Sequence, residues 1–139
     1  MKGVVIASHG EMANGVLDTS KLFFGDQEQL KAVCIHDGEN VDEFKELLRQ
    51  AIKDVDTGDG VIAICDMLFG TPCNCLAGLL GEGMENVDVI TGLNLPMILQ
   101  VLAARAAGDV DIQDLIQEGL DGIKNLKEVL AATADDEDE

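Results

Sequence analysis

His9, one of two histidines in this sequence, is the residue best placed for nucleophilic or acid–base chemistry, and the other is His36. His9 follows the short apolar run Gly3–Ala7 and stands between Ser8 and Gly10. A β-branched run of this length next to glycine is typical of a buried strand, so the histidine lies where the strand ends. Such a histidine is either a reactive group at a functional edge or a loop residue without a chemical role.

Asp66 is the second candidate, because it ends another continuous apolar run, Val61–Cys65. This run predicts a strand that is covered on both faces. When strands and helices alternate along a chain the sheet is parallel, and ligands collect beyond the carboxyl ends of its strands. If the two strands are neighbours, the Asp66 carboxylate lies within reach of the His9 imidazole.

Helix N-termini are expected at the same edge of the sheet. Apolar residues at helical spacing predict a helix that begins directly after His9. Thr71 followed by Pro72 predicts an N-cap and a first-position proline, and Gly92–Pro96 repeats this device for another helix. Because the free N–H groups and positive dipole end of a helix attract anions, three helix starts near one histidine favour a phosphate or other anion site.

The intervening segments fit an alternation of strands and helices. Further strands are predicted at Leu30–His36 and Val87–Thr91, and the most regular helical spacing follows Asn40, which forms a capping-box-like start with Glu43. The predicted fold class is therefore α/β, with a doubly wound, mainly parallel sheet and helices on both faces.

The C-terminal part of the chain has a mixed pattern. Spacing over Asp111–Leu130 is mainly helical, but Gly119 and Gly122 interrupt it. Asn125–Leu130 either continues the helix or forms a short terminal strand. Residues 131–139 end in a wholly acidic stretch, and we expect this tail to be disordered.

Composition limits the classes of function. A chain of 139 residues with 47% hydrophobic residues forms one domain with a sizeable core. Its 27 acidic and 9 basic residues give a net charge of -18, which argues against nucleic acid or an anionic membrane surface as a partner. The apolar N-terminal run is too short for a signal peptide, so a cytoplasmic location is expected.

The four cysteines give little indication of a metal or redox site. Cys34 and Cys65 fall in apolar runs and are expected in the core. Cys73 and Cys75 are separated by one residue, whereas zinc and redox pairs usually have two between them. We therefore expect neither a metal ion nor a cofactor.

Four short motifs, in order and at consistent separations, resemble the mannose-family enzyme IIA component of the bacterial sugar phosphotransferase system. They are Ser8–Gly10, Gly38–Asn40, Asp66–Asn74 and Gly92–Met97. The resemblance covers nearly the whole chain, with residues 1–130 as the IIA domain. It implies four parallel strands, a terminal antiparallel strand exchanged between the subunits of a homodimer, and a cytoplasmic phosphocarrier. The phosphoryl group would come from the phosphohistidine carrier protein HPr and pass to a IIB component.

The resemblance also implies roles for individual residues. It identifies His9 as the phosphorylated residue and Asp66 as its carboxylate partner, with Gly10, Gly70 and Thr71 around the phosphoryl group. The chemistry of these residues fits the roles. A carboxylate that accepts a hydrogen bond from one ring nitrogen fixes the tautomer and leaves the other nitrogen free to act as a nucleophile.

Two features set this chain apart from the usual family pattern. Phe69 stands where relatives commonly have the first of two glycines, which changes how the loop approaches the phosphoryl group. The chain also ends soon after Leu130, instead of entering an Ala/Pro-rich linker to a fused IIB domain. We therefore expect a free-standing IIA that meets its IIB in trans, together with membrane IIC and IID components.

Two other functions remain open at this point. One is the related phosphoryl-carrying subunit of dihydroxyacetone kinase, whose loop typically continues from the aspartate as Met-Gly-Ser-Ala, whereas this chain has Gly70–Pro72. The other is a regulatory binding domain that is controlled by phosphorylation. The transported sugar is also open, because a IIA domain handles only the phosphoryl group.

Overall fold

The structure of the protein is a computed structural model that describes residues 1–137, with side chains described as far as residue 134. Strands and helices alternate through most of the chain. The strands are β1 (Gly3–His9), β2 (Leu30–Ile35), β3 (Val61–Cys65) and β4 (Val87–Thr91). The helices are α1 (Met12–Phe24), α2 (Val41–Val55), α3 (Thr71–Gly81), α4 (Leu95–Ala107), α5 (Ile112–Asp121) and α6 (Leu126–Glu137).

The strands form one parallel sheet in the order β2-β1-β3-β4. The predicted doubly wound sheet with four parallel strands is therefore confirmed. The chain passes from β1 to β2 on one side and then returns to place β3 on the other side of β1. The carboxyl ends of β1 and β3 thus flank the point where the strand order reverses, which is where open α/β sheets bind their ligands.

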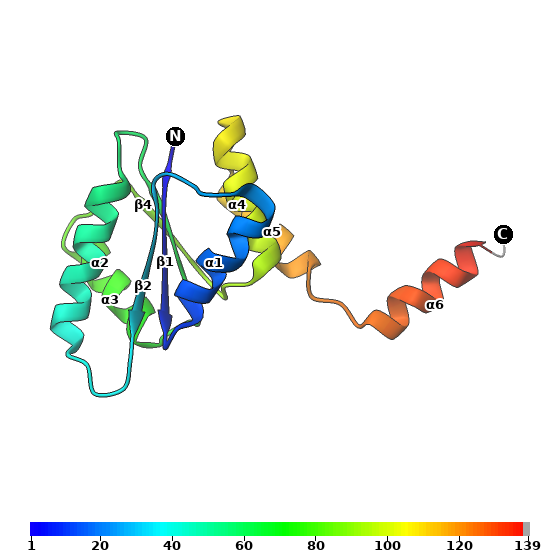
Figure 1. Ribbon diagram of the computed structural model, residues 1–139, viewed down its shortest axis with the longest axis horizontal. Coiled ribbons are helices and arrows are strands. Elements are labelled where there is room, and N and C mark those ends of the chain that lie inside the picture. The colour runs from blue at the N-terminus through cyan, green and yellow to red at the C-terminus, as the bar shows by residue number, and fades with distance from the viewer. Residues whose placement is uncertain (138–139) are drawn as a thin grey trace.

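Helices cover both faces of the sheet, and each face has its own core. Figure 1 shows α2 and α3 on one side and α1, α4 and α5 on the other. Alternate residues of the central strands contribute to the two cores, with Val5 and Ala7 in one and Val4 and Ile6 in the other. Because both faces are covered, β1 and β3 read as unbroken apolar runs in the sequence.

One predicted helix cap is present, a second is wrong by a residue, and the helix predicted to open at Gly92–Pro96 is capped by Asn94. Asn40 accepts a hydrogen bond from the backbone N–H of Glu43 at 3.0 Å, and Asn94 caps α4 in the same way. Thr71 is the first residue of α3 and Gly70 is its N-cap. The reason is that the Gly70 carbonyl accepts the first helical hydrogen bond, from Asn74 N at 2.9 Å.

The C-terminal segment is a helix, not a strand. Residues 126–137 form α6, so the antiparallel strand implied by the resemblance is absent from the described part of the sheet. The tail predicted to be disordered from residue 131 is helical to Glu137, because Ala131, Ala132 and Ala134 are strong helix formers. The last two residues, 138–139, lie outside the described part. Figure 1 shows α6 directed away from the body of the molecule.

Candidate functional site

The two residues that end β1 and β3 meet at the carboxyl edge of the sheet. Pairing of Ala7 with Cys65 across β1 and β3 places His9 beside Asp66. The His9 Nδ1 atom lies 2.8 Å from Asp66 Oδ2, and the backbone N–H of His9 donates to the same oxygen at 2.9 Å. The His9 side chain is 45% exposed, whereas that of Asp66 is only 11% exposed. The carboxylate is therefore held below an accessible imidazole.

Asp66 is fixed in its ionised form by its hydrogen bonds. Partial burial raises its pKa, but the N–H and ring of His9 and the N–H of Met67 lower it, and the net pKa lies below the usual value. A carboxylate can only accept hydrogen bonds, so a neutral His9 ring carries its proton on Nδ1. The lone pair of the neutral ring is then on Nε2, which is the nitrogen suited to nucleophilic attack.

The turn between β1 and α1 is fixed by a buried serine. Ser8 is fully buried, and its hydroxyl accepts a hydrogen bond from the Ala13 N–H at 2.7 Å. Gly10 takes a backbone φ of +57°, a conformation that favours glycine. Its N–H donates to the Ile35 carbonyl at 2.7 Å, so this donor is already used. Gly10 therefore shapes the turn that follows His9.

The loop between β3 and α3 packs against the His9 ring. A Cβ atom added to Gly70 would lie 2.5 Å from His9 Cε1, which is closer than real Cβ contacts allow. Phe69 has φ +64°, in the left-handed region that glycine occupies easily, and its side chain is 77% exposed. The glycine that the resemblance implies at this position would adopt this backbone easily. The loop keeps the glycine-like backbone although it carries a phenylalanine.

A pocket of about 410 Å³ opens between the ends of β1 and β2 and the start of α3. It brings together His9, Gly10 and Thr71 of the residues implied by the resemblance. Gly70 instead contacts the imidazole ring. The start of α4 contributes no residue to this pocket, so only two of the three predicted helix starts adjoin it. The pocket is lined by His9, Gly10, Ile35, His36, Asp37, Gly38 and Thr71.

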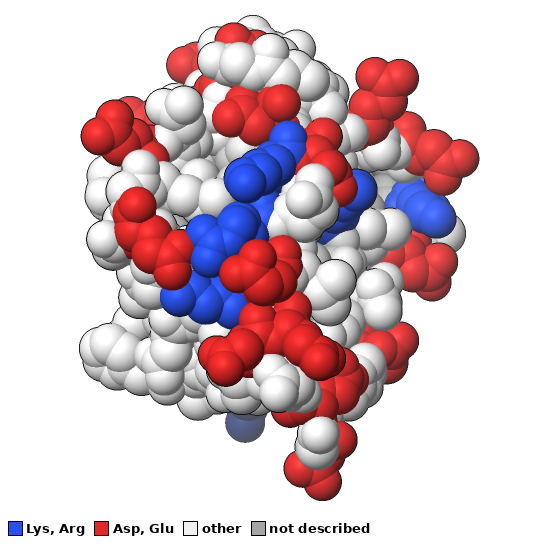
Figure 2. Space-filling view, turned by 90° about the vertical axis from the view of Figure 1, so that its left-hand side faces the viewer, with Lys and Arg blue, Asp and Glu red and all other residues white. Residues whose placement is uncertain are grey.

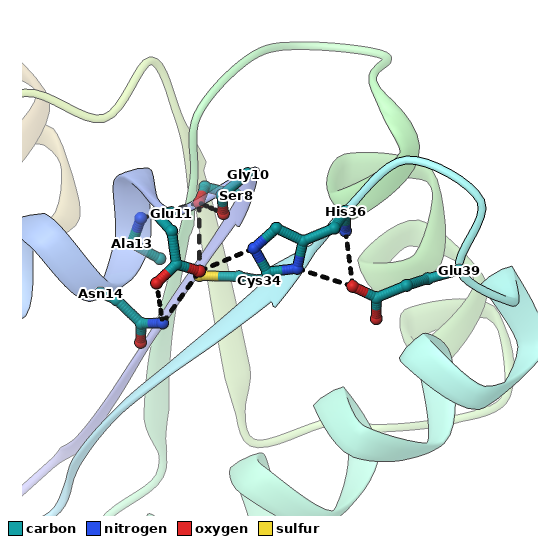
Figure 3. Close-up of polar contacts among 8 residues, drawn as sticks. All are labelled: Ser8, Gly10, Glu11, Ala13, Asn14, Cys34, His36 and Glu39. Carbon is teal, nitrogen blue, oxygen red and sulfur yellow. Dashed lines mark hydrogen bonds and ion pairs between the residues drawn. The ribbon is translucent and has the colours of Figure 1, made fainter.

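His36 also lines this pocket, although the sequence assigned it no role. Its Nδ1 atom lies 2.6 Å from Glu39 Oε1, and its Nε2 atom lies 2.7 Å from Glu11 Oε2 (Figure 3). The spacing of His36 and Glu39 along the chain is a local signal that a sequence reading could have used. Glu11 is distant in the sequence and no local pattern connects it to His36.

Features of other kinds of site are weak in the described residues. The four cysteines are unpaired, and the side chains of residues 1–134 contain no cluster of His, Cys, Asp and Glu that could hold a metal ion. Within that range no helix has the length and apolar character needed to cross a membrane. Figure 2 shows basic side chains among acidic ones on the side of α2 and α3, where Lys45 and Arg49 pair with Glu82.

Comparisons with known proteins agree on one family. Residues 3–118 match the EIIA-man family, described as the PTS system fructose IIA component. The fructose-specific EIIA component of Bacillus subtilis is 33% identical over 105 residues, covering 76% of this chain and 71% of that protein. The mannose-specific EIIAB component of Escherichia coli K12 is 30% identical over 128 residues, or 89% of this chain and 39% of the longer relative.

Solved structures have the same fold. The IIA protein associated with the fucose utilization operon of Streptococcus pneumoniae matches 93% of this chain and 96% of its own, with a TM-score of 0.86 and 24% identity. The mannose/sorbose-specific IIA subunit of Enterococcus faecalis matches 90% and 95%, with a TM-score of 0.74 and 24% identity. None of these comparisons supports the dihydroxyacetone kinase subunit or the regulatory domain as an alternative. The chain belongs to the EIIA-man family of phosphotransferase-system IIA components, which act as phosphoryl carriers in sugar uptake.

Proposed function

We propose that His9 is the residue that carries the phosphoryl group, and that Nε2 is the atom that bonds to phosphorus. The observation that supports this most directly is the 2.8 Å hydrogen bond between His9 Nδ1 and Asp66. It holds the ring proton on the side away from the attacking nitrogen. The exposed ring also faces a pocket that a phosphoryl donor can enter.

The transfer needs no metal or cofactor from the chain. The Nε2 lone pair of His9 attacks the phosphorus of the donor phosphohistidine, and a new N–P bond forms as the donor's N–P bond breaks. Positive charge develops on the His9 ring while Nδ1 keeps its proton. The Asp66 carboxylate stabilises this charge through the hydrogen bond, because it remains ionised. The same steps in reverse direction deliver the phosphoryl group to the acceptor.

Thr71 and the N-terminus of α3 are the groups proposed to hold the phosphoryl oxygens. Thr71 lines the pocket beside His9 and is the first residue of the helix. Its hydroxyl can donate a hydrogen bond, and the positive end of the helix dipole favours an anion. These groups must bind the phosphoryl group with moderate strength, because a phosphoryl group bound too tightly would not pass to the next protein.

Family membership implies that the chain interacts with HPr as donor and with a IIB component as acceptor. We propose that IIB is met in trans, that membrane IIC and IID components complete the transporter, and that the exchange takes place in the cytoplasm. The carboxylates around the pocket and the charge of -18 suit protein partners with complementary basic surfaces.

We also propose that the chain forms a homodimer through its C-terminal segment. The residues from Leu120 to Leu130 are exposed in the single chain, including Ile123 at 69%, Leu126 at 68% and Leu130 at 60% exposed. Large apolar side chains gathered on one projecting segment favour burial against another copy.

Labelling with phosphorylated HPr tests the role of His9. Wild type should gain one acid-labile phosphate per chain, and His9→Ala should gain none while its thermal melt shows a folded protein. His36→Ala is the matched control and should reach the wild-type end point after long incubation. Label on His9→Ala, or an unlabelled His36→Ala at the end point, would overturn the assignment.

A further inference from the structure

The second histidine of the pocket is placed between two carboxylates. Glu39 contacts its Nδ1 atom at 2.6 Å and Glu11 contacts its Nε2 atom at 2.7 Å. Because ionised carboxylates are acceptors only, both ring nitrogens must donate, and His36 is therefore an imidazolium. Its backbone N–H also donates to Glu39, at 3.0 Å. Figure 3 shows the ring bridging the end of β2 to the residue before α1.

Glu11 is the carboxylate whose position affects the phosphoryl site most directly. It is separated from His9 by Gly10 only, and it precedes the first turn of α1. Its side chain makes no capping hydrogen bond to this helix. Instead it contacts His36 and the side-chain amide of Asn14, which lies 3.2 Å from Oε1. The carboxylate is thereby held toward β2.

An unpaired carboxylate at this point would oppose phosphoryl transfer. The incoming group is an anion, and Asp66 and Asp37 already place negative charge around the pocket. His36 is the residue of the pocket lining with a carboxylate at each ring nitrogen, an arrangement that favours the imidazolium cation. Its positive charge offsets one of the two negative charges of Glu11 and Glu39, so the pocket accepts an anion at lower electrostatic cost than it would beside a neutral His36.

We propose that His36, as an imidazolium held by Glu11 and Glu39, is a positioning residue of the phosphoryl pocket. It neutralises the Glu11 carboxylate, holds it away from His9 and ties the start of α1 to the loop after β2. This inference rests on the proposed function, because it concerns the rate at which His9 takes up a phosphoryl group. His36 itself does not contact the reacting atoms.

The bridge has a defined pH range. Hydrogen bonds and charge from Glu39 and Glu11 raise the pKa of His36 above its ordinary 6.5, and Asn14 and His36 lower the pKa of Glu11. The bridge is therefore intact at neutral pH and is lost as the pH rises through the raised pKa of His36. The titratable groups near this ring are Glu11 of the β1–α1 turn, Asp37 and Glu39 of the β2–α2 loop, Cys34 of β2 and His9 of β1.

A set of variants tests the proposal through uptake rates from phosphorylated HPr. His36→Gln removes the cation and should slow uptake about three- to tenfold near neutral pH, as expected for one exposed charge interaction. The double variant with Glu11→Gln should recover to within about twofold of wild type, because it removes the repelling carboxylate as well. Lys31→Gln is the matched control, since Lys31 lies in β2, the strand that His36 directly follows, pairs with Asp54 at 2.7 Å and is similarly exposed. It should keep the wild-type rate.

The pH dependence separates an electrostatic role from a merely structural one. As the pH rises from neutral through the raised pKa of His36, the ratio of wild-type to His36→Gln rates should fall toward one, because His36 loses its proton. In an NMR titration of unphosphorylated wild type, the backbone amides of Gly10 and Asn14 should shift with the same midpoint as the His36 ring. In His36→Gln this transition should be absent.

The outcomes distinguish this inference from the proposed function. If wild type takes up label but His36→Gln matches its rate at every pH, or if the double variant stays as slow as His36→Gln, the positioning role is wrong. The same holds if the Gly10 amide does not follow the His36 titration. If wild type takes up no label at all, the carrier function fails, and the positioning role falls with it.

Discussion

Replacing Asp66 by asparagine tests the central contact of the proposed mechanism. The wild-type carboxylate accepts hydrogen bonds from His9 N, from His9 Nδ1 and from Met67 N, with distances between 2.8 and 3.0 Å. Asparagine has only one acceptor oxygen on its side chain. If this oxygen faces His9, the side-chain NH₂ group faces the Met67 N–H. In the opposite orientation, the NH₂ group faces both donors of His9. Either orientation loses at least one hydrogen bond and the negative charge.

The expected loss follows from these contacts. A hydrogen bond to a charged group contributes about 1.5–3 kcal/mol, which corresponds to about ten- to a hundredfold in rate if it is lost in the transition state. Loss of the charge that stabilises the developing imidazolium, together with a wrong tautomer of His9, extends this range to about a thousandfold. We therefore expect Asp66→Asn to transfer about ten to a thousand times more slowly than wild type.

Rapid mixing with phosphorylated HPr gives the rate, and thermal melts show whether both proteins are folded. Because the pKa of Asp66 is lowered in the folded protein, its contribution to stability is present near neutral pH and is lost as the pH falls through this lowered value. The comparison should therefore be made near neutral pH. A rate within about twofold of wild type for a folded Asp66→Asn would remove Asp66 from the mechanism.

Four further predictions concern the loop, the surface ion pairs and the C-terminus. Gly70→Ala would place a Cβ atom 2.5 Å from His9 Cε1, so the displaced ring should slow phosphoryl uptake by about tenfold or more in the same assay, and an unchanged rate would contradict the packing. Phe69→Gly should raise the melting temperature slightly or leave it unchanged, because relief of the left-handed backbone strain, about 1 kcal/mol, is offset by the greater conformational freedom of glycine in the unfolded chain. A clear loss of stability would show that the exposed ring packs against the protein. The pKa of Glu82 is lowered to about 2 by its two cationic partners from α2, so the stability that this residue contributes should be lost as the pH falls from about 4.5 to about 2. In Glu82→Gln, the free energy of unfolding should not show this loss over the same pH range. A chain ended before Gly122 should sediment as a monomer or be poorly soluble, whereas a stable dimer would refute the proposed interface.

The parts of the fold that the sequence predicts well are those set by burial. The runs in β1 and β3 are apolar on both faces because helices cover both sides of the sheet, and this alone indicates parallel strands. The start of α2 was predicted from the side chain of Asn40, which satisfies a free N–H group of the helix. The N-cap of α3 was predicted one residue too late, at Thr71 instead of Gly70. The cap lies where a carbonyl accepts the first helical hydrogen bond, and this depends on the backbone of Gly70 and not on the residue types.

At the C-terminal segment, the hydrophobic pattern covers too few residues to distinguish a helix from a strand. Asn125–Leu130 carries apolar residues that suit either an exposed helix or an edge strand. In the single chain they form part of α6, whose side chains are exposed as far as they are described. A strand at these residues would need the free edge of a sheet as its partner. Whether a second copy provides one is a property of the assembly, so the sequence of one chain does not contain the answer.

The candidate site combines contacts that sequence spacing reveals with contacts that it hides. His9 and Asp66 were predicted to meet because each ends a buried strand, and the order of the strands made them neighbours. The contact between His36 and Glu11 has no such signal, since both residues lie in surface turns and depend on side-chain direction. Local preference is also overridden at Phe69, which takes a conformation that favours glycine and directly precedes Gly70, the residue packed against the ring of His9. Residues that depart from local rules near a reactive group are therefore the ones for which a structure adds most to the sequence.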